Sequence, residues 1–296
     1  MKVIAPTTFA SATHFVSSNA VETVATYAAG TTYASGASVV YATRVWQSLA
    51  GSTTGNTPSS SPTWWLDVGP SNIYAMFDSQ VSTATTKASS PLTVTLSPGL
   101  CNSLALLGLV GTQLTVTMLD APAGSTVYSK TVSLEGSVVV DWYQYFFEPF
   151  SQIGEVVLTD LPVYSGARLT VSVSGAGAVS AGGLLFGTFF ELGAAEHGAT
   201  AGLIDYSRKE TDAFGTTTFV RRAFSKRMSV RLMLQTDALD KVQRILAGLR
   251  ATPAVWIASD NTAYRPLTVY GFYRDFSLEI AYRDRSYCSL EIEGLI

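Results

Sequence analysis

The sequence predicts a mainly β chain that ends in a smaller α+β region. Alternating apolar and polar residues recur through the first two thirds, as in Pro91–Leu96 and Gln113–Met118, and such alternation is typical of strands with one buried face. Clusters of Gly, Pro, Ser and Asn separate these stretches and favour turns. Only Asp237–Leu249 places apolar residues at strong helical spacing. We therefore expect many short strands and one helix near the C-terminus.

The length and composition limit the possible classes of protein. With 296 residues, the chain suits two or three domains. Charged residues make up 14%, below the roughly 25% of an average soluble protein, which fits either a surface covered by neighbours or a Ser/Thr-rich β protein. The net charge is −3, and the Lys and Arg residues that gather after residue 200 are interleaved with acidic ones. This pattern indicates a domain boundary near residue 200 and argues against nucleic-acid binding.

The residues that usually carry enzyme chemistry are sparse. His14 and His197 are far apart, and Cys101 and Cys288 are the only cysteines, so no metal-ligand spacing is present. Neither a nucleophile elbow nor a phosphate-binding glycine loop occurs. We therefore predict a protein that is not an enzyme, with no metal and no cofactor, and with two lone buried thiols. No apolar stretch has the length of a membrane span or an export signal, so we expect neither.

Changes in composition divide the chain into three predicted segments. Residues 1–72 should form a small hairpin-based module with an N-terminal arm and a polar loop at Gly51–Pro62. Residues 73–198 carry regularly spaced strand patterns separated by turns, which predicts a β-sandwich or jelly roll. Residues 199–296 should form an α+β domain with one helix packed on antiparallel strands.

The third segment begins with one long predicted strand, Phe219–Leu234, whose residues Phe224, Met228, Val230 and Leu232 should point inward. Either Thr236 or Asp237 is then expected to N-cap the helix.

Charged residues in this segment predict an assembly surface. Alternation places Arg221, Arg227 and Arg231 on one face, and several acidic residues lie in the later strands. Cross-strand pairing of these charges, within a subunit or between subunits, would stabilise a closed ring. The alternative is an ordinary solvated sheet face, on which each ion pair contributes about 0–1 kcal/mol.

Aromatic residues in the first segment predict a sugar-binding surface, because a pyranose stacks on flat aromatic rings. Adjacent Trp64 and Trp65 should point to opposite faces of a strand, so at most one of them is buried in the module. In the alternative interpretation, Tyr33 and Trp46 form the core of a small adaptor. The candidate residues are Tyr33, Tyr41, Trp46, Trp64 and Trp65.

A second aromatic run, Asp141–Phe147, contains too many bulky residues for one core. We expect alternate side chains to contact a second sheet or another chain, and we favour a domain or subunit contact over a ligand site. The candidate contact residues are Trp142, Tyr143, Tyr145 and Phe146.

The aromatic pattern of the first segment resembles the small chitin- and cellulose-binding modules of carbohydrate-binding families 5 and 12. Two positions differ, because Tyr27 replaces the family's opening Trp and Ala37 replaces its usual polar residue. The resemblance implies a three-stranded module that contacts glycans. It rests on Tyr27, Tyr33, Gly36, Val39, Tyr41, Trp46, Pro58, Trp64 and Trp65.

The wider layout resembles distal tail proteins of siphophages and prophages. The stretch Ile204–Gly215 is its most characteristic part, followed by Arg222–Met228 and Val269–Phe276, whereas Tyr74–Asp78 resembles the start of galactose-binding-like jelly rolls. The resemblance implies a virion protein of the tail tip or baseplate, made in the host cytoplasm. Its C-terminal domain would be tail-tube-like and assemble as a ring.

The partners implied are other tail proteins (tube, hub and tape measure) and host surface glycans, with no nucleic acid and no membrane insertion. Two alternatives stay open. One is a dedicated receptor-binding lectin, and the other is a non-catalytic part of a polysaccharide-degrading enzyme.

Overall fold

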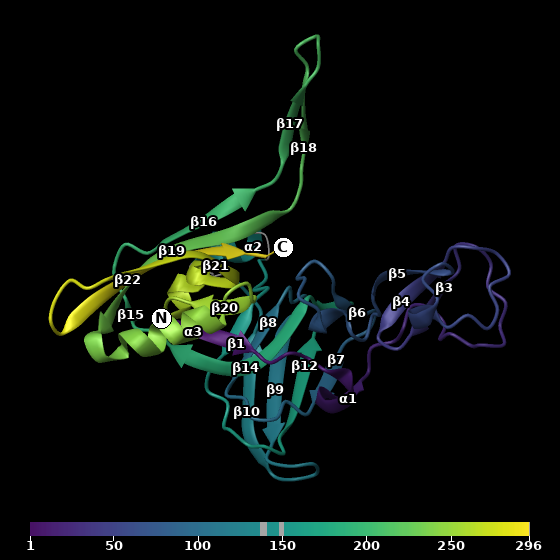
Figure 1. The fold of residues 1–296 in the computed structure, drawn as a ribbon, viewed down its shortest axis with the longest axis horizontal. Helices are drawn as coiled ribbons and strands as arrows, with labels where there is room; N and C mark the ends of the chain where they lie inside the picture. The colour runs from purple at the N-terminus through teal and green to yellow at the C-terminus, as the bar shows by residue number, and fades with distance from the viewer. Residues whose placement is uncertain (137–140, 148–150, 296) are drawn as a thin grey trace. The chain divides into compact units, whose positions relative to one another are not determined.

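The computed structural model describes residues 1–136, 141–147 and 151–295. Strands make up 47% of the chain and helices 11%, so the predicted mainly β class is confirmed. The chain divides into two compact units, which Figure 1 shows as a ribbon. Unit 1 consists of Met1–Thr7 together with Phe186–Ile296, and unit 2 consists of Thr8–Leu185.

This division differs from the three predicted segments at the N-terminus and near residue 198. Strand β1 (Lys2–Pro6) pairs with both β14 (Gly183–Glu191) and β20 (Ala254–Ile257). The first residues therefore complete the C-terminal sheet and do not form an arm of the N-terminal module. Because these pairing partners lie far away in the sequence, local alternation could not reveal them.

Unit 2 contains a five-stranded sheet with the strand order β10-β9-β12-β7-β2. Its inward residues are mostly Leu and Val, such as Leu96, Val116 and Leu169, whereas Thr and Ser alternate with them. The strands are β2 (Phe15–Ser18), β7 (Leu92–Leu96), β9 (Gln113–Leu119), β10 (Thr126–Ser133) and β12 (Arg168–Ser174). The expected strand patterns at Pro91–Leu96 and Gln113–Met118 are confirmed by β7 and β9.

Shorter elements complete this part of unit 2. β8 pairs with β11, and β6 pairs with β13, in both cases antiparallel. Two short helices, α1 and α2, were not predicted, because the sequence indicated only one helix near the C-terminus. The bounds are β6 (Thr85–Lys87), β8 (Ser103–Leu107), β11 (Val156–Leu158), β13 (Val179–Ala181), α1 (Ser11–His14), α2 (Trp142–Phe147) and a 3-10 turn at Ala75–Phe77.

The N-terminal part of unit 2 also contains a separate three-stranded antiparallel sheet. Its strands are β3 (Ser38–Tyr41), β4 (Arg44–Ser48) and β5 (Trp65–Pro70), with β4 in the centre. The β3–β4 hairpin was predicted from the sequence and is confirmed. The long polar loop between β4 and β5 contains a 3-10 turn at Pro58–Ser60.

Unit 1 is built on an antiparallel sheet with the order β14-β1-β20-β21-β22-β19, and β15 and β16 both pair with β19. Strand β19 pairs with β22 along nearly its whole length, from Arg227 opposite Glu293 to Gln235 opposite Arg285. The remaining bounds are β15 (Ala194–Ala195), β16 (Thr200–Asp205), β19 (Phe224–Gln235), β21 (Thr268–Glu279) and β22 (Arg285–Gly294).

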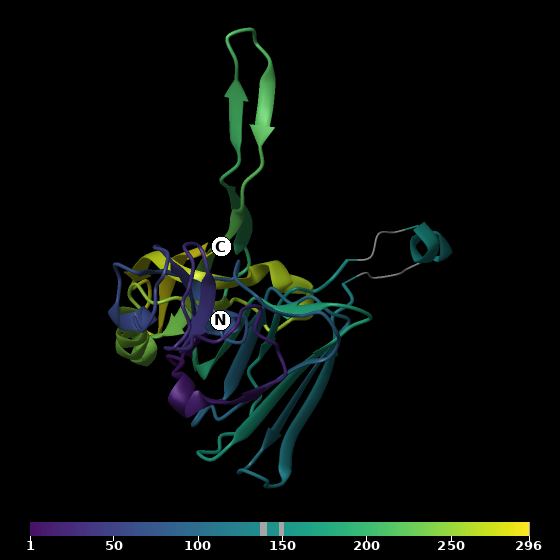
Figure 2. The same cartoon turned by 90° about the vertical axis from the view of Figure 1, so that its right-hand side faces the viewer.

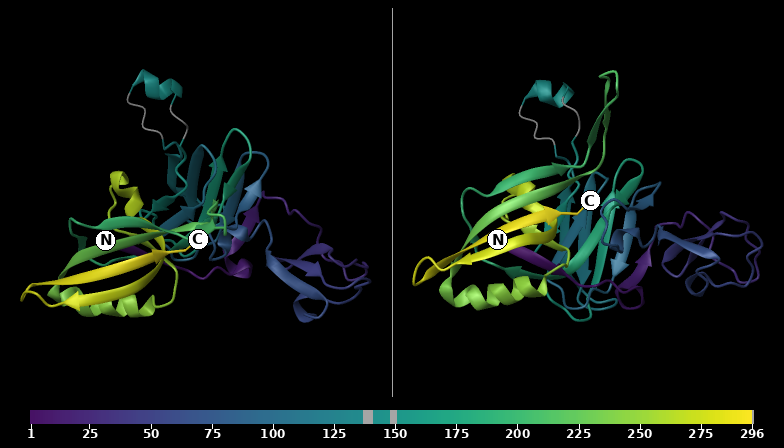
Figure 3. Two further views of the ribbon diagram at one scale, coloured as in Figure 1. Left: turned by 90° about the horizontal axis from the view of Figure 1, so that it is seen from above. Right: turned by 45° about the horizontal axis from the view of Figure 1, so that its top comes forward.

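Helix α3 (Leu239–Gly248) lies along this sheet, as Figure 3 shows. Val242, Leu246 and Leu249 pack into one cluster with inward residues of the strands, among them Trp256 and Leu290. A 3-10 turn at Thr236–Ala238 precedes α3. Neither predicted N-cap is used, since α3 has no side-chain cap and the Thr236 hydroxyl donates to the Arg283 carbonyl instead, at 3.2 Å.

The strand predicted over Phe219–Leu234 is interrupted. β18 (Thr217–Val220) pairs with β17 (Arg208–Thr211) in a separate hairpin, and β19 begins only at Phe224. Met228, Val230 and Leu232 point inward as expected, whereas Phe224 is 53% exposed. Phe224 lies before the residues that pair with β22 and pairs only with β16, so the core does not reach it.

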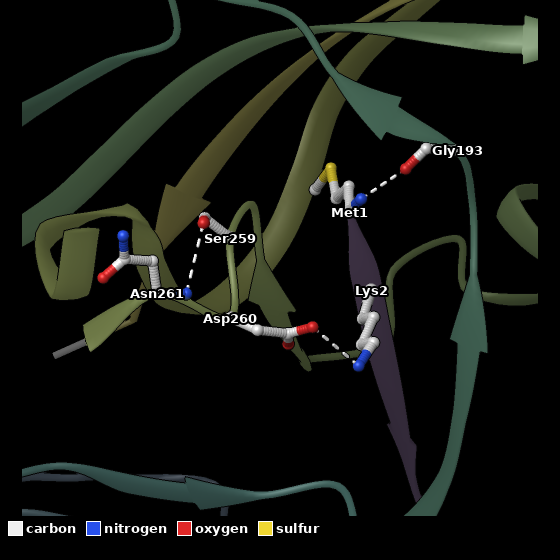
Figure 4. A network of polar contacts seen from close by, with 6 residues as sticks. All are labelled: Met1, Lys2, Gly193, Ser259, Asp260 and Asn261. Carbon is white, nitrogen blue, oxygen red and sulfur yellow. Dashed lines mark hydrogen bonds and ion pairs between the residues drawn. The ribbon is translucent and has the colours of Figure 1, made fainter. Parts of the chain in front are cut away.

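The first residues of the chain are fixed inside unit 1, as Figure 4 shows. The Met1 amino group donates to the Gly193 carbonyl, and burial lowers the pKa of that amino group. Lys2 Nζ forms a salt bridge with Asp260 at 2.8 Å. These contacts fix β1 between its two neighbouring strands.

Cys101 and Cys288 are both free and buried, as the sequence predicted. Burial raises the pKa of each thiol to about 11, so both stay protonated and unreactive near neutral pH.

Candidate functional site

The aromatic residues of the N-terminal module form a packed cluster. The Tyr27 ring stacks on Tyr33 at 5.7 Å and meets Tyr41 and Trp65 edge-on at 5.7 and 5.8 Å. Tyr33 also meets Trp65 edge-on at 5.3 Å, and its hydroxyl accepts a hydrogen bond from the Ala28 amide at 2.8 Å. Edge-to-face and offset pairs are favourable arrangements for stabilising a small core.

Trp65 is 2% exposed, and its Nε1 donates to the Asn56 carbonyl at 2.8 Å. The structure therefore places Trp65 in the core, where its ring forms edge-to-face pairs with Tyr27 and Tyr33. Trp64 is 37% exposed. The expectation that at most one of these two tryptophans is buried is thus confirmed.

Trp46 lies opposite Val39 in the β3–β4 ladder. Its Nε1 and the Tyr27 hydroxyl are both buried, and neither has a partner among the described residues. Of the five candidates, Tyr33, Tyr41 and Trp65 lie in the aromatic cluster, Trp46 is half-buried, and only Trp64 is exposed.

Two exposed leucines at positions neighbouring Trp64 were not predicted as part of a surface. Leu49 and Leu66 are each 50% exposed, and the Leu49 amide donates to the Trp64 carbonyl at 2.8 Å. Gln47 pairs with Leu66 across β4 and β5 and supplies a polar group on the same face. One aromatic ring beside a polar group suits contact with a sugar, but the sequence could not single it out among so many aromatics.

The second aromatic run forms helix α2 and not a strand, which corrects the expected alternation. Trp142, Tyr143 and Phe146 are each more than two-thirds exposed, as is Phe147. Trp142 stacks on Phe146 at 6.3 Å, as helical spacing requires. The side chain of Tyr145 lies outside the described residues. Figure 2 shows α2 as one short coil.

The three candidate arginines of unit 1 lie in different environments. Arg231 pairs with Glu279 at 2.9 Å and with Glu196 at 3.7 Å, and its guanidinium lies 4.3 Å from the centre of the Tyr287 ring. Its charge is therefore satisfied within the chain. Arg221 lies between β18 and β19, outside any strand, so it does not share a strand face with the other two.

Arg227 lines a groove of about 330 Å³ between β16, β19, β21 and β22. Arg274, Glu291 and Glu293 also line it. Arg274 is the extra residue at a bulge where β21 pairs with β22, a position that re-aims side chains and has no signal in the sequence.

A surface cluster in unit 2 also escaped the sequence analysis. The Tyr128 hydroxyl and Lys130 Nζ each donate to Asp160, both at 2.8 Å. Burial would raise the pKa of Asp160, but these two hydrogen bonds outweigh it, so the pKa lies below its usual range. Burial and the bond to Asp160 together raise the pKa of Tyr128.

Tyr128→Phe is expected to raise the pKa of Asp160 toward its ordinary value, because the carboxylate loses one donor. A carboxyl whose pKa is lowered by folding stabilises the protein above its unfolded pKa, and this contribution is lost as the pH falls through the folded pKa. The variant should therefore lose less stability on acidification than the wild type. NMR titration of the Asp160 carboxyl measures the shift, and Tyr164→Phe, at an exposed tyrosine that is not a donor to Asp160, should leave it unchanged.

Within the part of the chain that the structure describes, no group of three His, Cys, Asp or Glu side chains is placed to hold a metal ion. Over the same residues, no helix combines the length and apolar character needed to span a bilayer. A comparison with known families finds no matching family model, and a comparison with curated proteins finds no matching sequence.

Proposed function

We propose that the chain is a non-enzymatic structural component of a bacteriophage tail tip or baseplate, and that it assembles as a homo-oligomer through unit 1. The observation that carries this proposal is the β17–β18 hairpin. All eight residues of its two strands are exposed, and it extends away from β16 and β19 (Figures 1 and 2). An isolated two-stranded hairpin is marginally stable in water.

Exposed aromatic residues support the same proposal. Phe214 at the turn of the hairpin is 95% exposed, and Phe219 in β18 is 75% exposed. Exposed large apolar residues on one element are typical of interaction surfaces. A subunit that covered the hairpin would bury these side chains and supply the stability that the hairpin lacks.

The finer architecture belongs to the same proposal. Unit 1, with one helix on an antiparallel sheet, corresponds to the tail-tube-like domain, and unit 2 combines a jelly-roll-like sandwich with a carbohydrate-binding-like module. Tube, hub and tape-measure proteins are the partners that the resemblance implies. Under this proposal the protein is made in the host cytoplasm and becomes part of the virion.

Excising the hairpin tests the assembly. Replacing residues 208–220 with a short Gly-Ser turn should convert the purified oligomer to monomers in sedimentation velocity experiments. Circular dichroism should remain that of a folded β protein, because the hairpin contributes nothing to the unit 1 core. A wild-type chain that remains monomeric at every concentration would contradict the proposal.

A second candidate function, a receptor-binding lectin, is favoured by the exposed Trp64. A glycan array with the wild type and Trp64→Ala tests it, since Trp64 can be removed without disturbing the buried cluster. Glycan binding that disappears in the variant supports the lectin. A wild type that binds no glycan removes this function and leaves assembly unaffected.

A further inference from the structure

Two features of unit 1 have no partner among the residues that the structure describes, and their chemistry is complementary. The first is the groove between β16, β19, β21 and β22, with a volume of about 330 Å³. That volume lies at the lower end of the range for ligand sites, so the groove can take one or two large side chains but not a whole strand. The second feature is the tip of the β17–β18 hairpin.

The groove has an apolar part and charged walls. Ala201 and Ile204 provide apolar surface, and Arg227, Arg274 and Glu293 are among the charged residues that line it. Arg227 lies directly opposite Glu293 in the β19–β22 ladder, yet neither arginine forms a salt bridge with any described residue. Both guanidinium groups are therefore available to a ligand.

Gly202 helps to form the groove. It lies opposite Arg227 in the β16–β19 ladder, and a Cβ at this position would come within 2.9 Å of Arg227 Nε. The absence of a side chain allows the arginine to lie across β16. A larger residue here would displace the guanidinium.

The hairpin tip is a defined turn. Asp212 Oδ1 accepts hydrogen bonds from the Phe214 and Thr216 amides at 2.9 and 2.8 Å, and Gly215 has a positive φ of 82°. These bonds fix the turn while Phe214 stays 95% exposed. A preformed turn loses little conformational entropy when it docks.

We propose, building on the assembly function above, that the hairpin tip of one copy docks into the groove of a second copy. The Phe214 ring enters between Arg227 and Arg274, whose guanidinium groups are attracted to the faces of an aromatic ring. The Asp212 carboxylate beside Phe214 adds a negative charge for the arginines. Lys209, further along the hairpin, supplies the positive charge for Glu291 and Glu293 at the groove.

A second copy is the occupant because the hairpin extends away from its own sheet (Figures 1 and 2). The tip and the groove are different surfaces, so each subunit offers one of each. Such head-to-tail contacts generate closed rings or open filaments. The same contact would bury the exposed Phe214 and satisfy the groove's arginines.

Complementation between two full-length variants tests the contact. Phe214→Ala removes the tip, and Arg227→Glu combined with Arg274→Glu reverses the charge of the groove. Each variant alone should sediment as a monomer. An equimolar mixture should form heterodimers, because one variant keeps its groove and the other keeps its tip. Tyr282→Ala, which removes a 62% exposed aromatic elsewhere in unit 1, should assemble like the wild type.

The outcomes separate this inference from the assembly function. If both variants still form the wild-type oligomer, the tip–groove contact is wrong while assembly stands. If the variants are folded monomers that fail to complement each other, the head-to-tail contact is overturned. A wild type that never oligomerises overturns both proposals. A photo-crosslinking residue at position 214 should attach to residues 227–229 or 291–293 of a second copy, and attachment elsewhere argues against the groove.

Discussion

Trp65→Ala is expected to unfold the three-stranded N-terminal sheet. Trp65 is 2% exposed and contacts Tyr27 and Tyr33 edge-on, and its removal also leaves the Asn56 carbonyl without a donor. Truncating a buried Trp typically costs about 3–5 kcal/mol, which is comparable to the whole stability that a core of this size supplies. Limited proteolysis should cut the variant rapidly between residues 20 and 72.

Trp64→Ala is the matched control, because it removes the same side chain from the adjacent position. Because Trp64 is 37% exposed, its substitution should lower the stability of the sheet by well under half as much as Trp65→Ala does. The two variants therefore separate the core from the candidate glycan surface. Equal protease resistance of Trp65→Ala and the wild type would show that the aromatic cluster does not hold this sheet together.

Much of the strand content could be predicted, because burial of one face imposes a period of two on the sequence. The alternation at Gln113–Met118 matches β9, and the helical spacing after Asp237 matches α3. In both cases the signal is local, since each element buries one of its own faces. Periodicity of this kind does not identify the pairing partner of a strand. The sequence therefore contained no signal that β1 would lie between β14 and β20.

The interruption between β18 and β19 shows a second limit. Residues Phe219–Phe224 continue a strand-like pattern, but the buried core cluster includes residues of β19 only after Phe224, from Met228 on, and the preceding hairpin is exposed on both faces. An exposed hairpin and a buried strand can share the same alternation. The sequence therefore predicted that Arg221 and Arg227 share one strand face, whereas Arg221 lies outside any strand.

The candidate site residues were chosen by residue type, and residue type alone does not determine whether a side chain packs in a core or binds a partner. Aromatic residues in a small β module can form its hydrophobic core as readily as they can bind a sugar. Here Tyr33 and Trp65 pack against each other. The sequence left open whether the charge of Arg231 would pair within a subunit or between subunits, and in this chain Arg231 pairs with Glu279 and lies over the Tyr287 ring. The groove around Arg274 depends on a bulge, and a bulge shifts the register without changing the composition.

Trp256→Ala is expected to have the largest effect on unit 1, because this side chain is fully buried at the centre of its core. Its Nε1 donates to the Gly271 carbonyl at 3.0 Å, and its ring meets Tyr273 edge-on at 6.0 Å. The loss should reach about 3–5 kcal/mol from the lost packing and the resulting cavity, with the unpaired carbonyl adding to it. The midpoint of denaturant-induced unfolding of unit 1 should fall accordingly.

Trp256→Phe separates packing from hydrogen bonding. It keeps a ring in the core but leaves the Gly271 carbonyl unpaired, so its midpoint should lie between those of the wild type and Trp256→Ala. Because the hairpin and the groove are both carried by the unit 1 sheet, Trp256→Ala should also abolish oligomers, whereas Trp256→Phe should retain them where unit 1 remains folded. If Trp256→Ala unfolds at the same denaturant concentration as the wild type, the packing of α3 against the strands does not depend on this residue. Trp256 would then not be central to the unit 1 core.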